Sequence, residues 1–166
     1  MKAIASFLLS SVILAMLGVC AAETHTVRLV NRCGFGTPKL IKGSNVLSTG
    51  ADYVSRGPLT AAIAYMQDPN THKDRCGFNG DGCTIVETTL VNPDPKRPGS
   101  GSSTDISLIP PLKYSVKTGF GYYGGCNGAG ASCGGQDCNT AFKQPWDTHV
   151  QVACQTNDVN LAITFC

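Results

Sequence analysis

The cysteines constrain the fold of this chain more than any other feature of its sequence. Nine are present, of which Cys20 lies in an apolar leader and eight follow it. An even number of cysteines in a secreted chain indicates four disulfides, although sequence alone permits about a hundred pairings. A metal site is the alternative, but no C-x-x-C pair occurs and His25, His72 and His149 show no ligand spacing. We therefore expect a disulfide-stabilised protein with no metal and no cofactor.

The leader has the three parts of a secretory signal peptide. Lys2 supplies the positive start, "FLLSSVILAMLGV" is the apolar segment, and "VCAA" offers small residues for cleavage. The apolar run is shorter than the ~20 residues that a membrane span needs. We expect residues 1–22 to be removed, leaving one secreted domain over residues 23–166.

The charges of the expected mature chain are nearly balanced. Without Lys2, 12 basic and 11 acidic side chains remain, so the net charge is close to neutral. Such balance gives no reason to expect a nucleic-acid partner, and it argues against membrane disruption by charge alone. We expect a monomer that makes no stable membrane insertion.

Short alternating segments, separated by Gly, Pro and Asn, predict an all-β sandwich. In "HTVRLVN" the buried positions are Val27 and Leu29, with Arg28 on the other side and His25 left outside the buried set. "CTIVETTLV", "THVQVAC" and "VNLAITFC" behave alike. The segment "LTAAIAYMQD" has alanines that favour a helix, but flanking prolines leave only ten residues, so we prefer a strand.

The stretch "SSTDISLIPPL" places Asp105 directly before the apolar residues Ile106, Leu108 and Ile109. This pattern predicts a short half-buried strand that ends at Pro110-Pro111. A carboxylate at the start of such a strand can cap the turn of residues 102–104, because Asp bonds nearby backbone amides. It can also belong to a functional site.

Four segments together resemble the thaumatin-like proteins, in the same order along the chain. They are "VRLVNRCGF", "STDISLIPPLKYSV", "GGCNGAGASC" and the terminal "ITFC". The likeness is greatest to small secreted fungal members, some of which elicit plant defence and the hypersensitive response. It implies a compact, disulfide-rich β-sandwich whose second domain is reduced to residues 124–141.

The resemblance also implies how the cysteines pair. By position, the first joins the last and the fourth joins the seventh, while one pair closes a local loop and one pair remains. The implied disulfides are Cys33–Cys166, Cys126–Cys154, Cys76–Cys83 and Cys133–Cys138.

Many thaumatin-like proteins have an acidic cleft of one Arg, one Glu and three Asp, and some bind or slowly cut β-1,3-glucan. Glu87, Asp105 and Asp147 match three of these positions. Ser102 stands near a missing Asp, and the segment expected to carry the Arg reads "TAAIAYM". If the cleft is catalytic, Glu87 would be the acid and Asp105 its partner. Alternatively, Glu87 faces solvent from a strand and Asp147 belongs to a loop.

Three aromatic residues, Tyr122, Tyr123 and Trp146, lie near the Gly-rich segment and Asp147 in the sequence. Exposed aromatic rings beside carboxylates would suit a glycan, although a sole tryptophan is more often partly buried. The leading hypothesis is a non-catalytic elicitor of the plant apoplast or cell wall. It would bind β-1,3-glucan or a host plant surface component. The alternatives are a weak endo-β-1,3-glucanase and an antifungal permeabilising protein.

Overall fold

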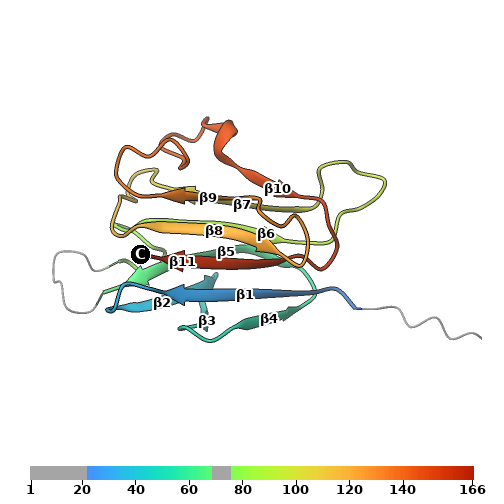
Figure 1. Cartoon of the computed structure of the whole chain (residues 1–166), viewed down its shortest axis with the longest axis horizontal. Coiled ribbons are helices and arrows are strands. Elements are labelled where there is room, and N and C mark those ends of the chain that lie inside the picture. Colours follow the sequence, from blue (N-terminus) through green and yellow to red (C-terminus); the bar gives the residue numbers. More distant parts are fainter. Residues whose placement is uncertain (1–21, 69–75) are drawn as a thin grey trace, which may run out of the picture.

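The computed structural model describes residues 22–68 and 76–166, which form two β-sheets packed face to face (Figure 1). The five-stranded sheet has the order β4-β1-β11-β8-β9, and the six-stranded sheet has the order β10-β7-β6-β5-β2-β3. The strands are β1 Thr24–Asn31, β2 Thr37–Lys42, β3 Asn45–Ser48, β4 Tyr53–Arg56, β5 Leu59–Gln67, β6 Ile85–Leu90, β7 Ser102–Ser107, β8 Thr118–Tyr123, β9 Gly130–Cys133, β10 Val152–Cys154 and β11 Asn160–Phe165. A short 3-10 helix, η1, spans Thr148–Val150. The expected all-β sandwich is confirmed.

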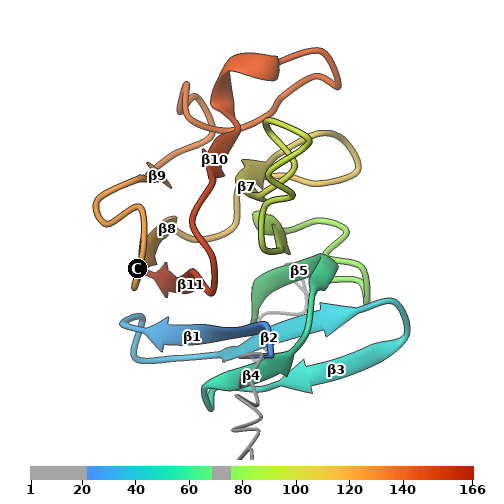
Figure 2. The same cartoon turned by 90° about the vertical axis from the view of Figure 1, so that its right-hand side faces the viewer.

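Strands from the two ends of the described residues, β1 and β11, are neighbours in the five-stranded sheet. Strands β1 and β11 pair in parallel, with Val27 opposite Leu161 (Figure 2). A disulfide with an S–S distance of 2.03 Å joins Cys33, just beyond β1, to Cys166. The other disulfides also join the cysteines that the resemblance pairs, namely Cys76–Cys83, Cys126–Cys154 and Cys133–Cys138.

The main core lies between the sheets and contains the inward side chains of both. In β1 these are Val27 and Leu29, as the alternation predicts, and also His25, which is fully buried. The exclusion of His25 from the buried set was therefore wrong. Its Nδ1 lies 2.7 Å from the carbonyl oxygen of Val159 and its Nε2 lies 2.9 Å from Glu23 Oε1. A buried histidine is tolerated here because both ring nitrogens have polar partners.

Strand β7 begins and ends earlier than the sequence indicates. It spans Ser102–Ser107, so Asp105 lies within the strand, and Leu108 follows its end. Residues 102–104 form no turn because they belong to β7, and the side chains of Ser102 and Thr104 have partners inside the sandwich. Thr104 Oγ1 lies 2.7 Å from Thr88 Oγ1, and Ser102 Oγ accepts the Val91 N–H at 3.0 Å. The turn-cap interpretation of Asp105 is thereby excluded.

A smaller apolar cluster covers one end of the outer face of the six-stranded sheet. It consists of Ile41, Tyr65, Cys76, Cys83 and Ile85, all buried. Ile41, Tyr65 and Ile85 alternate along their strands with residues of the main core, which places them on the opposite face. The rest of this outer face carries the candidate site. Within the described residues, no helix is long and apolar enough to cross a membrane.

Candidate functional site

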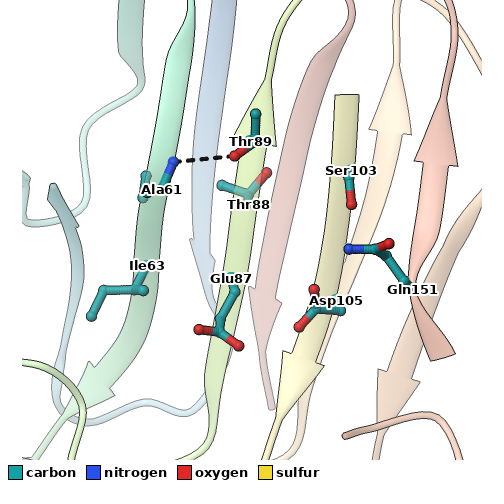
Figure 3. A pocket seen from close by; sticks show the side chains of 9 residues that line it. Ala61, Ile63, Glu87, Thr88, Thr89, Ser103, Asp105 and Gln151 are labelled. Atoms are coloured by element: carbon teal, nitrogen blue, oxygen red, sulfur yellow. Dashed lines mark hydrogen bonds between the residues drawn. The ribbon is translucent and has the colours of Figure 1, made fainter. Parts of the chain in front are cut away.

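A row of side chains crosses three neighbouring strands on the outer face of the six-stranded sheet. Ile63 of β5 is paired with Glu87 of β6, and Glu87 is paired with Asp105 of β7. Gln151 lies immediately before β10, whose Val152 pairs with Thr104, so that its side chain lies beside Asp105 (Figure 3). The sheet register therefore brings together two carboxyl groups that are 18 residues apart in the sequence.

This row forms the floor of a shallow, open pocket of about 170 Å³. Hydroxyl, amide, carboxyl and small aliphatic groups line it, and the lining includes no aromatic and no basic side chain. The lining residues are Ala61, Ala62, Ile63, Glu87, Thr88, Thr89, Ser103, Asp105 and Gln151. The volume is below the ~300–1,000 Å³ of sites that enclose drug-sized ligands, so the pocket suits one small group.

A β-bulge shapes one side of the pocket. The pairing of β5 with β6 shifts between Leu59 and Ala62, and Ala61 has a φ of 51°. The backbone N–H of Ala61 turns out of the ladder and donates to Thr89 Oγ1 at 3.1 Å (Figure 3). A residue with a side chain in the left-handed region costs of order 1–3 kcal/mol and persists only where its surroundings hold it.

Asp105 is the most perturbed acid of the pocket. Its residue is only 7 % exposed, and its Oδ1 is buried without a hydrogen-bond partner among the described residues. Burial raises the pKa of Asp105 to about 7, the charge of Glu87 adds to the rise, and interaction with the Gln151 side chain opposes it. Burial disfavours the charged form of Asp105, and the neighbouring charge of Glu87 disfavours a second negative charge beside it. The raised pKa thus belongs to Asp105, whereas the sequence assigned the acid role to Glu87.

The expected arginine is absent from the pocket. The described ion pairs join Arg28 to Asp52, Arg97 to Asp94 and His25 to Glu23, and none reaches Glu87 or Asp105. Ser102 is buried on the inner side of β7, where it bonds Val91 and so lies away from the pocket. The acidic pair consequently has no cationic neighbour among its lining residues.

The structure places Asp147 outside the pocket lining. Its Oδ2 accepts the backbone N–H groups of Lys143 and Gln144, each at 2.9 Å. These hydrogen bonds hold the pKa of Asp147 below its ordinary value. Asp147 therefore organises the loop that precedes η1, which is the loop role that the sequence left open for it.

The three aromatic residues do not line the pocket either. Tyr122 is buried, and its hydroxyl donates toward Thr104 Oγ1 at 2.9 Å. Tyr123 belongs to the five-stranded sheet, where the Arg28 guanidinium lies 5.5 Å from its ring centroid. Trp146 is 72 % exposed on the loop before η1, so it is not the partly buried core residue that the sequence left as an alternative. A stacking platform for a sugar ring is thus missing from the lining.

Sequence reasoning missed Ala61, Thr89 and Gln151. Thr89 and Gln151 lie in the segments "CTIVETTLV" and "THVQVAC", which the alternation identifies as strands. The alternation does not give the register between strands, and the register is what sets these residues beside the carboxyl groups. Among the described residues, no group of three or more His, Cys, Asp or Glu side chains could hold a metal ion.

The comparisons with known proteins identify the fold. No model of a known protein family matches the chain, and no curated protein does. Among solved structures, a thaumatin-like xylanase inhibitor matches with a TM-score of 0.54 and 17 % sequence identity. The fold is thaumatin-like. The match covers 86 % of this chain and 98 % of the inhibitor.

Proposed function

We propose that this thaumatin-like protein is a secreted, non-catalytic binding protein that holds its partner at the Glu87–Asp105 pocket. The observation that carries the proposal is the pair of carboxyl groups on adjacent strands, one of them buried without a hydrogen-bond partner for Oδ1. A buried polar atom of this kind is costly unless something pairs with it. A bound partner would supply that pairing.

Secretion is part of the proposal. Residues 1–22, whose pattern predicts a signal peptide, lie almost wholly outside the described residues, so their removal stays a prediction. Four disulfides support an oxidising compartment, because such bonds persist outside the cytosol. We place the protein in the apoplast or cell wall, as a fungal elicitor of plant defence, on the likeness of its sequence motifs to such proteins.

The matched structure supports a protein partner. It is a xylanase inhibitor, so a thaumatin-like fold can serve to bind an enzyme. The pocket of the present chain supports the same choice, because its lining offers no aromatic ring for a sugar to stack on. The sequence left two partners open, β-1,3-glucan and a host plant surface component. We therefore favour the second and propose that it is a protein.

A glycosidase is the second candidate, and one observation favours it. A carboxyl group with a pKa of about 7 beside a second carboxyl group is the arrangement that general acid catalysis of glycoside hydrolysis uses. Asp105 would be the acid and Glu87 the nucleophile or base. The small open pocket and the missing arginine leave little to hold and distort a polysaccharide, so this candidate ranks second.

One assay separates the two candidates. The secreted protein is incubated with insoluble β-1,3-glucan, and bound protein and released reducing ends are followed together. We expect no release from the wild type. Release that Glu87→Gln/Asp105→Asn abolishes would establish a glucanase and overturn the binding proposal. Glucan binding without release, lost in the same variant, would retain the binding role with a glycan as ligand.

A further inference from the structure

We propose that the Glu87–Asp105 pocket receives the guanidinium group of an arginine side chain from a protein partner. This inference rests on the binding role proposed above and names the chemistry of the ligand. Three features of the site support it, namely the Asp105 Oδ1 atom that has no hydrogen-bond partner among the described residues, the size and composition of the pocket, and the charges around it.

The pocket contains negative charge that nothing in its lining compensates. Glu87 is exposed, Asp105 is nine-tenths buried, and their strands place them directly opposite one another. Like charges opposite each other across two strands destabilise a sheet. Figure 3 shows the Asp105 carboxyl group directed toward the side where Glu87 lies. A cation between the two groups would remove this repulsion and pair the buried oxygen.

The pocket fits a side chain better than a sugar chain. Its volume of about 170 Å³ and its open form suit a group that enters end-on from a neighbouring protein. Arginine suits this site because its planar guanidinium carries five N–H donors and bonds carboxylates in a bidentate manner. Thr89, Ser103 and Gln151 also line the pocket and offer further oxygen acceptors for such a fork.

Asp105 has no positively charged neighbour among the residues that line the pocket. Glu87 faces it from β6, Gln151 lies beside it before β10, and Tyr122 of β8 interacts with it electrostatically from below. None of these three residues is basic. Ala61 and Ile63 of β5, which also line the pocket, are uncharged. An arriving guanidinium therefore meets no like charge in the lining and would draw Asp105 into its ionised form.

The test uses N-acetyl-arginine amide as the probe and N-acetyl-citrulline amide as its uncharged match. Backbone amide signals of the isotope-labelled secreted protein are followed by NMR during titration. We expect saturable shifts of Glu87, Asp105 and Thr89 with the arginine probe only. We expect Glu87→Gln and Asp105→Asn each to weaken binding about tenfold or more, since each removes a charge-assisted hydrogen bond. Asp137→Asn, an exposed carboxylate outside the lining, should bind like the wild type.

The pH profile provides a second readout. Because Asp105 has a pKa of about 7, only its ionised form at higher pH presents a full charge to the probe. Affinity should rise between about pH 5 and about pH 8, and this rise should vanish in Asp105→Asn. Thermal unfolding of each variant confirms that it is folded.

Three results would overturn the inference. They are no saturable binding of the arginine probe, equal binding of the citrulline probe, or binding that neither pocket variant weakens. A soluble β-1,3-glucan fragment that shifts the same signals while the arginine probe does not would overturn the inference and leave the binding function standing. Release of reducing ends from glucan would instead remove the binding function itself.

Discussion

The hydroxyl group of Tyr122 on β8 donates across the sandwich to Thr104 Oγ1, 2.9 Å away on the strand that carries Asp105. The same hydroxyl lies 3.0 Å from the carbonyl oxygen of Val152 on β10. Tyr122 thus ties the two strands that flank one side of the pocket, β7 and β10, to the opposite sheet. Tyr122 therefore supports the site from the inner side of the sandwich, whereas the sequence analysis placed it among the aromatic residues that would bind a glycan.

Removal of that hydroxyl should cost stability. In Tyr122→Phe, Thr104 Oγ1 and the Val152 carbonyl both lose a buried hydrogen-bond partner, so we expect the free energy of unfolding to fall by about 1–2 kcal/mol. Chemical denaturation monitored by circular dichroism measures this. Tyr123→Phe is the matched control, because Tyr123 is only partly buried, and it should change little. Equal effects of the two variants would contradict the supporting role of Tyr122.

Asp105 should make the protein less stable as the pH rises. The pKa of Asp105 is about 7 in the folded protein, whereas an unfolded Asp titrates near ~3.9. Between these values the folded state binds more protons than the unfolded state, so the stabilising proton is progressively lost toward pH 7. The difference between these two pKa values corresponds to about 4 kcal/mol at most.

Asp105→Asn tests this linkage because it keeps the shape of the side chain and removes its titration. Denaturation at about pH 4 and about pH 8 should show the variant gaining stability relative to the wild type as the pH increases. A constant difference between the two proteins across this range would show that Asp105 does not carry the linkage.

The left-handed backbone of Ala61 predicts a stabilising substitution. Glycine adopts a φ of 51° without the steric cost of a side chain, so Ala61→Gly should raise the free energy of unfolding by about 0.5–1 kcal/mol. Ala64 lies in the same strand with ordinary geometry and is fully buried, so Ala64→Gly should destabilise. Opposite signs in thermal unfolding are the expected result. Destabilisation by both would show that Ala61 is not strained.

The Cys33–Cys166 disulfide should matter most among the four for stability. It closes a loop with a sequence separation of 133, whereas Cys76–Cys83 closes one of 7. In the chain-entropy account a loop that long contributes about 4–5 kcal/mol, and a short loop contributes less. Replacing both cysteines of a bridge with serine removes that disulfide without leaving a free thiol, so the contributions of the bridges to stability can be compared. We expect lower secreted yield and melting temperature for Cys33→Ser/Cys166→Ser than for Cys76→Ser/Cys83→Ser.

Local pattern indicated β1, β5, β6, β7, β10 and β11 but not their partners, and it did not identify β2, β3, β4, β8 or β9. The alternation in "HTVRLVN" gives Val27 and Leu29 correctly, yet it misses His25, whose burial depends on the Val159 carbonyl 134 residues away. In the same way, Ser102 and Thr104 look like turn residues until their hydroxyl partners on other strands are known.

The candidate site was likewise predictable in part, because its residue types can be predicted from the sequence and their neighbours cannot. The resemblance implied Glu87 and Asp105, and the register between β6 and β7 sets them opposite one another. The bulge at Ala61 and the approach of Gln151 arise from pairing between distant segments, which no single stretch of sequence encodes. Asp147 has the expected residue type, but its loop turns its carboxylate toward its own backbone.

The position of β11 has a consequence for how the protein is made. This last strand lies in the centre of the five-stranded sheet, between β1 and β8. During synthesis β1, β4, β8 and β9 leave the ribosome before β11, and they remain two separate pairs until residues 160–165 are available. The five-stranded sheet is therefore complete only after synthesis has passed β11, and such long-range closure is slow. Until β11 is added, the edges of β1 and β8 that it covers are unpaired, and exposed edges of this kind invite pairing with other chains.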